Sequence, residues 1–175
     1  QLGRTVYFQD NQLIGYFNRE QSRGYLAAVY TIRNGVMVLD IPDIGTISLK
    51  LENTSSKITA DIVDDVPHFQ IEVSCKAYIS EINQDLRKEL SLDVYEKFET
   101  ALNEKLKLQI ESAVEQAVIR DSTDIFNFDV ALQQQQTEYW KVHRDSWAQE
   151  LAKIKYTVNV TSSVDRVQQE ASPAF

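Results

Sequence analysis

Three aspartates lie close together in the sequence, where carboxylates could act in acid–base chemistry or bind a divalent cation. They are Asp121, Asp124 and Asp129. Paired carboxylates support hydrolysis only when they line a cleft and the pKa of one of them is raised, and a sequence shows neither condition. Aspartate is also common at chain reversals and helix starts, because it accepts hydrogen bonds from backbone N–H groups. We therefore expect Asp121 or Thr123 to cap a reversal and Asp129 to begin a helix.

The aromatic residues that follow are a stronger signal. Phe126 and Phe128 are two residues apart, so their rings project from the same side of an extended segment. Trp140 and Trp147 are seven residues apart, which places them on one face of a helix. Such rings most simply anchor the end of the chain to the core, although ligand pockets also favour aromatic linings. The four glutamines at 133–136 are expected to form the exposed part of a helix between these anchors.

Motifs for other chemistry are absent from the sequence. There is no glycine-rich nucleotide loop, no zinc-protease motif and no serine-hydrolase elbow. The two histidines, His68 and His143, have no further histidine or cysteine at ligand spacing. The only cysteine, Cys75, cannot form an intrachain disulfide, and the alternation around it predicts a buried thiol. We expect no cofactor and no metal ion.

Length and charge restrict the class of protein further. A chain of 175 residues with 43% hydrophobic residues is expected to form one domain, 1–175. The net charge of −8 repels nucleic acid, and the sequence contains no basic patch that would overcome this repulsion. No apolar run approaches the roughly 20 residues that a membrane-spanning helix requires. Binding to nucleic acid and insertion into a membrane are therefore not expected of this chain.

The N-terminal half has the turn signals and alternation of β-strands. Segments 5–9 and 12–17 flank the turn pair Asp10-Asn11 and predict a β-hairpin. Asn18 and Gln21 have the spacing of a capping box, which predicts a helix over 19–30. The residues expected on the buried side of this helix and just after it are Tyr25, Leu26, Val29 and Ile32. Further strands are predicted over 36–41, 46–52, 57–63 and 68–81.

The C-terminal half changes to helical periodicity. Apolar residues recur every three or four positions over 93–120 and predict a helix about 40 Å long. Helices are expected over 129–140 and 146–153, and alternation over 154–164 predicts a last strand. Strands, then helices, then one closing strand indicate an α+β domain. Its antiparallel β-sheet should carry the long helix and the shorter helices packed on one face.

Two stretches resemble the C subunits of bacterial spore nutrient germinant receptors, the Ger(x)C family. The first is NQLIGYFNREQSRGYLAAV, which is similar to the family's hairpin and the helix after it. The matching positions in this stretch are Gly15, Glu20, Arg23 and Gly24. The second stretch matches the family's aromatic segment in residue type and order at Asp124, Ile125, Phe126, Phe128, Trp140 and Trp147. It departs from the family at Asn127 and Asp129, where glycine is usual.

The resemblance implies that this chain is the C-terminal domain of a larger lipoprotein, whose lipid-anchored N-terminal part lies outside it. The full-length protein would then lie on the extracytoplasmic side of the spore inner membrane, which it reaches only through that anchor. Its implied partners are the membrane-embedded A and B subunits of the receptor, with which it would act in nutrient-triggered germination. The resemblance implies no catalytic residues.

Three functions remain open at the level of sequence. The first is a non-enzymatic receptor domain that acts by protein–protein interaction. In it, Glu20 and Arg23 form either a surface pair on a helix or part of a partner-binding patch. The second is direct binding of a small nutrient in a pocket near Trp140 and Trp147. The third is a hydrolase that acts on cell-wall material through Asp121, Asp124 and Asp129.

Overall fold

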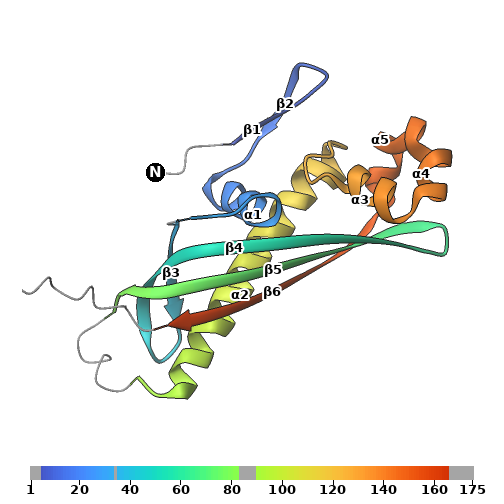
Figure 1. The fold of residues 1–175 in the computed structure, drawn as a ribbon. Helices are drawn as coiled ribbons and strands as arrows, with labels where there is room; N and C mark the ends of the chain where they lie inside the picture. Colours follow the sequence, from blue (N-terminus) through green and yellow to red (C-terminus); the bar gives the residue numbers. More distant parts are fainter. Residues whose placement is uncertain (1–4, 34, 83–89, 166–175) are drawn as a thin grey trace, which may run out of the picture.

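The computed structural model describes residues 5–33, 35–82 and 90–165, which form a four-stranded sheet, a separate two-stranded hairpin and several helices (Figure 1). The π-helical and 3₁₀ segments carry the label η. The elements in chain order are β1 (Val6–Gln9), β2 (Gln12–Tyr16), α1 (Arg19–Val29), β3 (Gly35–Ile41), β4 (Gly45–Val63), β5 (Val66–Glu81), α2 (Leu92–Val114), η2 (Glu115–Arg120), α3 (Phe128–Gln135), α4 (Thr137–His143), η3 (Arg144–Ser146), α5 (Trp147–Glu150), η4 (Leu151–Lys153) and β6 (Lys155–Asp165).

The main sheet has the strand order β3-β4-β5-β6, and α2 runs across one of its faces (Figure 1). The predicted α+β class, with a long helix packed on a sheet, is confirmed. One pairing differs from the prediction, since β6 runs parallel to β5 and the sheet is therefore mixed. Parallel neighbours require a long crossover connection. The helical segments after β5 supply it, and they return the chain to Lys155, which pairs with His68 near the start of β5.

β4 is one strand of 19 residues, whereas the sequence predicted two strands separated by an Asn/Ser turn. The polar residues at 53–56 remain in the strand and pair with β5, with register shifts between Ser48 and Leu49 and between Leu51 and Asn53. Thr54 faces inward, where its hydroxyl accepts a hydrogen bond of 2.7 Å from the Ile32 backbone N–H. The predicted turn was wrong because this inward-facing hydroxyl has a partner in the core and its neighbours face water.

The core lies between β5 and α2. As the alternation predicted, the inward residues of β5 are buried, namely Phe69, Ile71, Val73, Cys75, Ala77 and Ile79. The facing stripe of α2 is buried as well, and it includes Phe98, Leu102, Leu106 and Ile110. Burial raises the pKa of the Cys75 thiol to about 11, so this thiol stays protonated and behaves as a small apolar side chain. The predicted 93–120 helix corresponds to α2 and η2 together.

α1 packs directly against α2, and a glycine sets the distance between them. A Cβ atom on Gly24 would lie 2.3 Å from the backbone carbonyl carbon and oxygen of Gln109, so only glycine fits this crossing. The predicted buried side of the helix is therefore wrong in part, because the large residues Tyr25, Leu26 and Val29 are only half-buried. The buried residues of α1 are Gln21, Ser22, Arg23, Gly24, Ala27 and Ala28. Ile32, which follows the helix, is buried as predicted.

Helix side chains cover three open strand edges of the main sheet. Lys105 of α2 donates to the Val38 carbonyl on β3 at 3.0 Å, and Glu99 accepts from the Val164 N–H on β6 at 3.0 Å. The part of β4 that extends beyond β3 is covered by the glutamines of α3. Unpaired strand edges favour aggregation, so these contacts protect the sheet as well as stabilise it.

Two of the four glutamines therefore have a structural task that the sequence did not reveal. The Gln135 side chain accepts from the Ala60 N–H at 3.0 Å and donates to the Ile58 carbonyl at 3.2 Å, as a neighbouring strand would. Gln136 donates to the Ala60 carbonyl at 3.2 Å. The predicted 129–140 helix is broken at Gln136, whose φ of −133° ends α3 before α4 begins. Residues 133–135 are exposed, as predicted.

Gln135→Ala is expected to lower the free energy of unfolding by about 1 kcal/mol, because it removes two hydrogen bonds from a partly solvated strand edge. The backbone N–H of Ala60 should also exchange with solvent faster, which hydrogen-exchange mass spectrometry or NMR would measure. Gln134→Ala is the matched control, since Gln134 is the exposed neighbour on the same helix. Equal effects of the two substitutions would contradict the assigned role.

Candidate functional site

The structure brings most of the aromatic candidates into one cluster. Phe126 and Phe128 are fully buried, and their rings stack with centroids 5.7 Å apart. Phe128 also stacks on Phe69 of β5 at 4.3 Å, and the Trp147 ring meets the same Phe69 edge-on at 6.3 Å. Trp140 contacts Trp147 at 5.7 Å in a T-shaped arrangement, although α4 and α5 are separate helices. The cluster fastens the C-terminal helices to the sheet.

Asp124 is the polar centre of this cluster. One carboxylate oxygen accepts from the Phe128 N–H at 3.0 Å, and the other accepts from the Asp129 N–H at 2.8 Å and the Trp147 indole N–H at 2.9 Å. Asp124 thus caps the start of α3, and Asp129 lies in the first turn of that helix, as predicted. Asn127 lies in the left-handed region with φ of 61°. Asparagine adopts this region more readily than most residues, so the turn tolerates a residue other than glycine here.

The three aspartates do not form a shared acid–base site. Burial raises the pKa of Asp124, while the hydrogen bonds from Trp147 and the two backbone N–H groups oppose that rise. Asp121 accepts a hydrogen bond from the Tyr7 hydroxyl, and Asp129 accepts one from the Val130 N–H at 2.7 Å. Each carboxylate is therefore engaged in a different local contact, which argues against the hydrolase interpretation.

A polar network joins the hairpin to η2, to Asp121 after it and to α1. The Tyr7 hydroxyl donates to Asp121 and accepts from Gln116 at 3.0 Å. Gln116 in turn accepts from Gln21 of α1 at 2.8 Å. Burial and the bond to Asp121 raise the pKa of Tyr7 to about 12. A Cβ atom on Gly15 would lie 2.4 Å from the Tyr7 hydroxyl oxygen, so this motif glycine leaves the space through which Tyr7 reaches Asp121.

Glu20 and Arg23 do not form the predicted surface pair. Glu20 is exposed, whereas Arg23 is only 7% exposed, and no ion pair joins them. The Nε atom of Arg23 is buried and has no hydrogen-bond partner within the described residues. Burial, followed by the charge of Arg19, lowers the pKa of this guanidinium group. The prediction failed because the close crossing at Gly24 buries the adjacent side chain.

A groove of about 500 Å³ lies between the start of α1, the outer stripe of α2 and the end of β3. Its charged and polar lining includes Asn18, Glu20, Asp40, Glu104, Lys105 and Gln109. Gln109 is 4% exposed, and neither its amide nitrogen nor its amide oxygen has a hydrogen-bond partner within the described residues. The sequence signal was a glutamine in the buried stripe of α2, one turn after Leu106. Its position in that stripe predicts a core residue and not a site residue.

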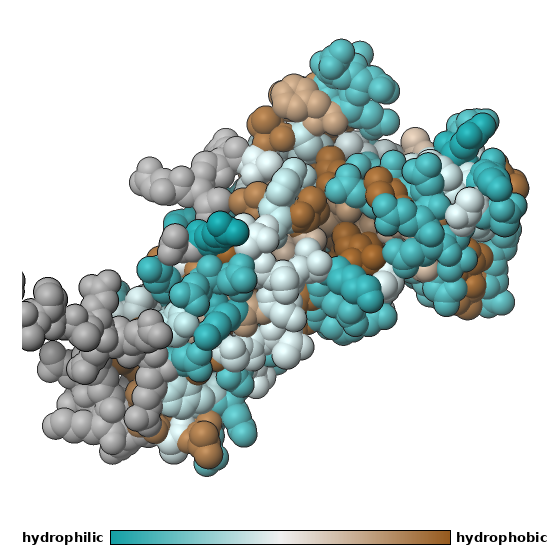
Figure 2. All heavy atoms as spheres, in the orientation of Figure 1, coloured by the Kyte–Doolittle hydropathy of each residue, from teal (hydrophilic) through white to brown (hydrophobic). Residues whose placement is uncertain are grey.

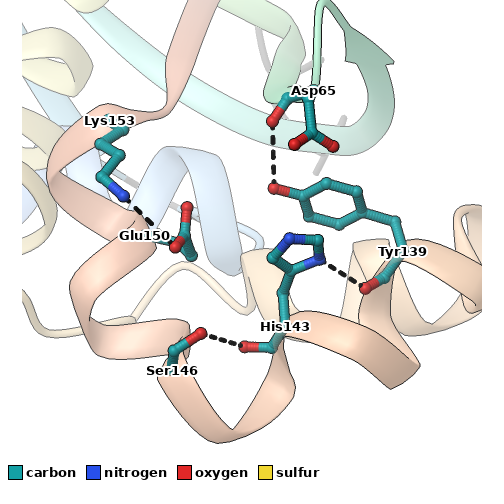
Figure 3. Close-up of polar contacts among 6 residues, drawn as sticks. All are labelled: Asp65, Tyr139, His143, Ser146, Glu150 and Lys153. Atoms are coloured by element: carbon teal, nitrogen blue, oxygen red, sulfur yellow. Dashed lines mark hydrogen bonds and ion pairs between the residues drawn. The ribbon is translucent and has the colours of Figure 1, made fainter.

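Contacts of α4 also tie the tip of the β4–β5 hairpin to the helical segment (Figure 3). The Tyr139 hydroxyl donates to the Asp65 carbonyl at 3.3 Å, and the His143 ring stacks on Tyr139 with centroids 3.9 Å apart. Figure 3 shows two contacts of His143. Its ring Nδ1 atom is hydrogen-bonded to the Tyr139 carbonyl, and the Ser146 hydroxyl donates to the His143 carbonyl. In the ranges that the structure describes, no three histidine, cysteine or acidic side chains gather as metal ligands, and no helix is long and apolar enough to cross a membrane.

Trp147→Phe is expected to lower the free energy of unfolding by about 2 kcal/mol near neutral pH, because it removes a donor from a buried carboxylate. The folded pKa of Asp124 lies above its ordinary value of 3.8. The stability that this carboxyl contributes is therefore present below pH 3.8 and is lost as the pH rises through the folded pKa. Loss of the indole N–H raises the folded pKa further. The cost of Trp147→Phe should therefore be larger at pH 7 than at pH 3, as measured by urea unfolding.

Trp140→Phe is the control for this substitution, since Trp140 is half-buried and none of the described hydrogen bonds of Asp124 involves it. It should cost less than about 1 kcal/mol, with little dependence on pH. A cost of Trp147→Phe that is the same at both pH values would show that only ring packing is lost.

Comparisons with known proteins agree with this architecture. In a search of the solved structures, the crystal structure of the GerBC protein matches with a TM-score of 0.78 and 18% sequence identity, which shows a shared fold. The match covers 88% of this chain and 48% of that one, so the chain spans about half the length of GerBC. No curated protein matches the chain. Residues 3–168 match the family described as "Spore germination B3/GerAC like, C-terminal". The chain therefore belongs to this spore germination family of germinant receptor C subunits, as its two motif stretches predicted.

Proposed function

We propose that this domain is a non-enzymatic part of a nutrient germinant receptor subunit and acts through protein–protein contacts. Membership of the spore germination family carries the proposal. The proposed partners are the membrane-embedded A and B subunits. The full-length protein is proposed to lie on the extracytoplasmic side of the spore inner membrane and to reach it through a lipid anchor outside this chain.

The state of the carboxylates supports a role without catalysis. A general acid or nucleophile must face a substrate with a free oxygen or proton. Instead, both oxygens of Asp124 accept hydrogen bonds within the fold, and Asp121 is bound to Tyr7. The Trp147 indole N–H likewise donates to Asp124 within the fold. These groups hold the domain in one shape, which is what a contact module requires.

The open face of the main sheet is the surface best suited to such contacts. It is the face opposite α2, and its exposed residues include Lys57, Glu72, Ser74, Lys76, Asn159 and Thr161. Direct cross-strand partners link them, as Ser74 pairs with Thr161 and Glu72 pairs with both Lys57 and Asn159. Three paired strands make this surface rigid, so little conformational freedom is lost when a partner binds it.

Ser74→Arg tests this surface, because the new side chain would project from the middle of the open face. It should reduce co-purification of the A and B subunits with the full-length protein by about tenfold and slow nutrient-triggered germination. Gln134→Arg is the control, since it places the same side chain at an exposed position of α3. Unchanged co-purification with Ser74→Arg would remove the open face from the proposal. Failure of the unaltered protein to associate with either subunit would overturn the function.

Direct binding of a small nutrient is a second candidate, and the groove beside Gln109 favours it. An unpaired buried amide costs roughly 1 to 3 kcal/mol, and a ligand with its own donor and acceptor would recover that cost. The groove carries Glu20, Asp40 and Glu104 against Lys105, which suits a ligand with an amino group. The Gln109 amide is shielded from solvent, so a small side-chain movement must accompany binding.

Gln109→Met tests the cost of the unpaired amide to stability separately from its proposed contact with a ligand. It should raise the free energy of unfolding by about 1 kcal/mol, because it removes an unpaired polar group at similar volume. In the unaltered chain, an amino acid or sugar that binds the groove should shift the Gln109 side-chain amide signal in a ¹⁵N NMR spectrum. A panel of nutrients that leaves this signal in place, together with a destabilised Gln109→Met variant, would reject nutrient binding here.

A further inference from the structure

The β1–β2 hairpin exposes large apolar side chains. Val6, Phe8, Leu13 and Ile14 are 50%, 56%, 60% and 39% exposed, and they are called the hairpin face below. Phe8 and Leu13 are direct cross-strand partners, next to a register shift between Tyr7 and Phe8. Figure 1 shows the hairpin projecting from the rest of the domain, and Figure 2 shows brown and tan atoms gathered on it beneath a hydrophilic tip.

The hairpin is held to the domain through Tyr7. Tyr7 is 4% exposed, packs against Phe17 with ring centroids 4.9 Å apart, and bonds to Asp121. A two-stranded hairpin on its own is at best marginally stable in water. These contacts fix the hairpin in place, and they do so without covering the hairpin face.

The edge of β2 is covered at its end, where the Gln116 side chain donates to the Tyr16 carbonyl at 3.0 Å. Side chains of Lys105, Gln135 and Glu99 cover open edges of β3, β4 and β6. Among the described residues, β1 and β2 pair only with each other. Open strand edges beside exposed apolar residues are the features that another protein segment uses to dock.

The comparisons with known proteins indicate which protein segment would dock on the hairpin. The matched family is described as C-terminal, so its members carry further chain before this domain. About half of the GerBC chain lies outside the match. In such a protein the preceding chain leads directly into β1, the first described element. A lipid surface is a poorer occupant, since a net charge of −8 repels the anionic lipids that attract peripheral proteins.

We propose that the hairpin face is the docking surface for the part of the same polypeptide that precedes this domain. The preceding part would cover the apolar side chains and couple its own position to η2 and α1 through Tyr7, Gln116 and Gln21. This inference rests on the fold and the family and does not depend on the proposed function.

Phe8→Lys, made in both the 175-residue chain and the full-length protein, tests the proposal. In the 175-residue chain it should leave the unfolding midpoint unchanged, because Phe8 is exposed there. In the full-length protein it should lower the midpoint. Backbone amides of residues 6–16 should exchange about tenfold more slowly in the full-length protein than in the shorter chain, and Phe8→Lys should abolish that difference. Val142→Lys on α4 is the control, since Val142 is 75% exposed and far along the sequence.

Equal exchange of residues 6–16 in the two proteins would overturn the proposal. Sedimentation of the 175-residue chain that shows a dimer lost in Phe8→Lys would assign the hairpin face to a second copy instead. Binding to phosphatidylcholine vesicles that is lost in Phe8→Lys would assign it to lipid. Both proteins are purified without the A and B subunits, so failure of the receptor function cannot produce any of these results.

Discussion

The carboxylate of Asp124 is the interaction on which the C-terminal third of the fold depends. Its oxygens hold the first turn of α3 and, through the Trp147 indole, the helical segment 23 residues later. With both ends fixed, α3 lies along β4 and places Gln135 on the open strand edge. The same constraint directs the chain into β6, whose parallel pairing with β5 completes the sheet. One buried acceptor thereby connects the helix start, the aromatic cluster and the sheet.

The N-terminal third depends on steric constraints instead. Gly15 leaves room for the Tyr7 ring, and Gly24 lets α1 approach the α2 backbone. The hydrogen bonds of Gln21 and Gln116 then join the hairpin, α1 and η2. Both glycines belong to the stretch that carries the family resemblance. The resemblance at this end therefore identifies places where no side chain fits, rather than places where chemistry occurs.

The sequence predicted those features that local patterns determine. The capping box of Asn18 and Gln21, the Asp10-Asn11 turn and the alternation of β5 all depend on neighbours within a few residues. Predictions failed where a distant partner decides the outcome. Thr54 stays in a strand because of Ile32, Arg23 is buried because α1 crosses α2 at Gly24, and Gln135 covers β4 across 75 positions of sequence. The parallel direction of β6 is likewise set by the crossover and not by its own residues.

The candidate site shows the same division between local and distant causes. Asp124, Phe126, Phe128 and Trp147 were recognisable by type and spacing, and the structure does bring them together, but as a structural cluster. Their polar atoms are satisfied by one another, so little is left for a substrate or ligand. Gln109 is the opposite case, since its amide is buried, unpaired and beside a groove. A fold keeps an uncompensated buried amide at a cost in stability, and such costs concentrate where function requires them. The accessible residues of the groove, the open sheet face and the hairpin face are thus the ones that distinguish what this domain recognises from how it folds.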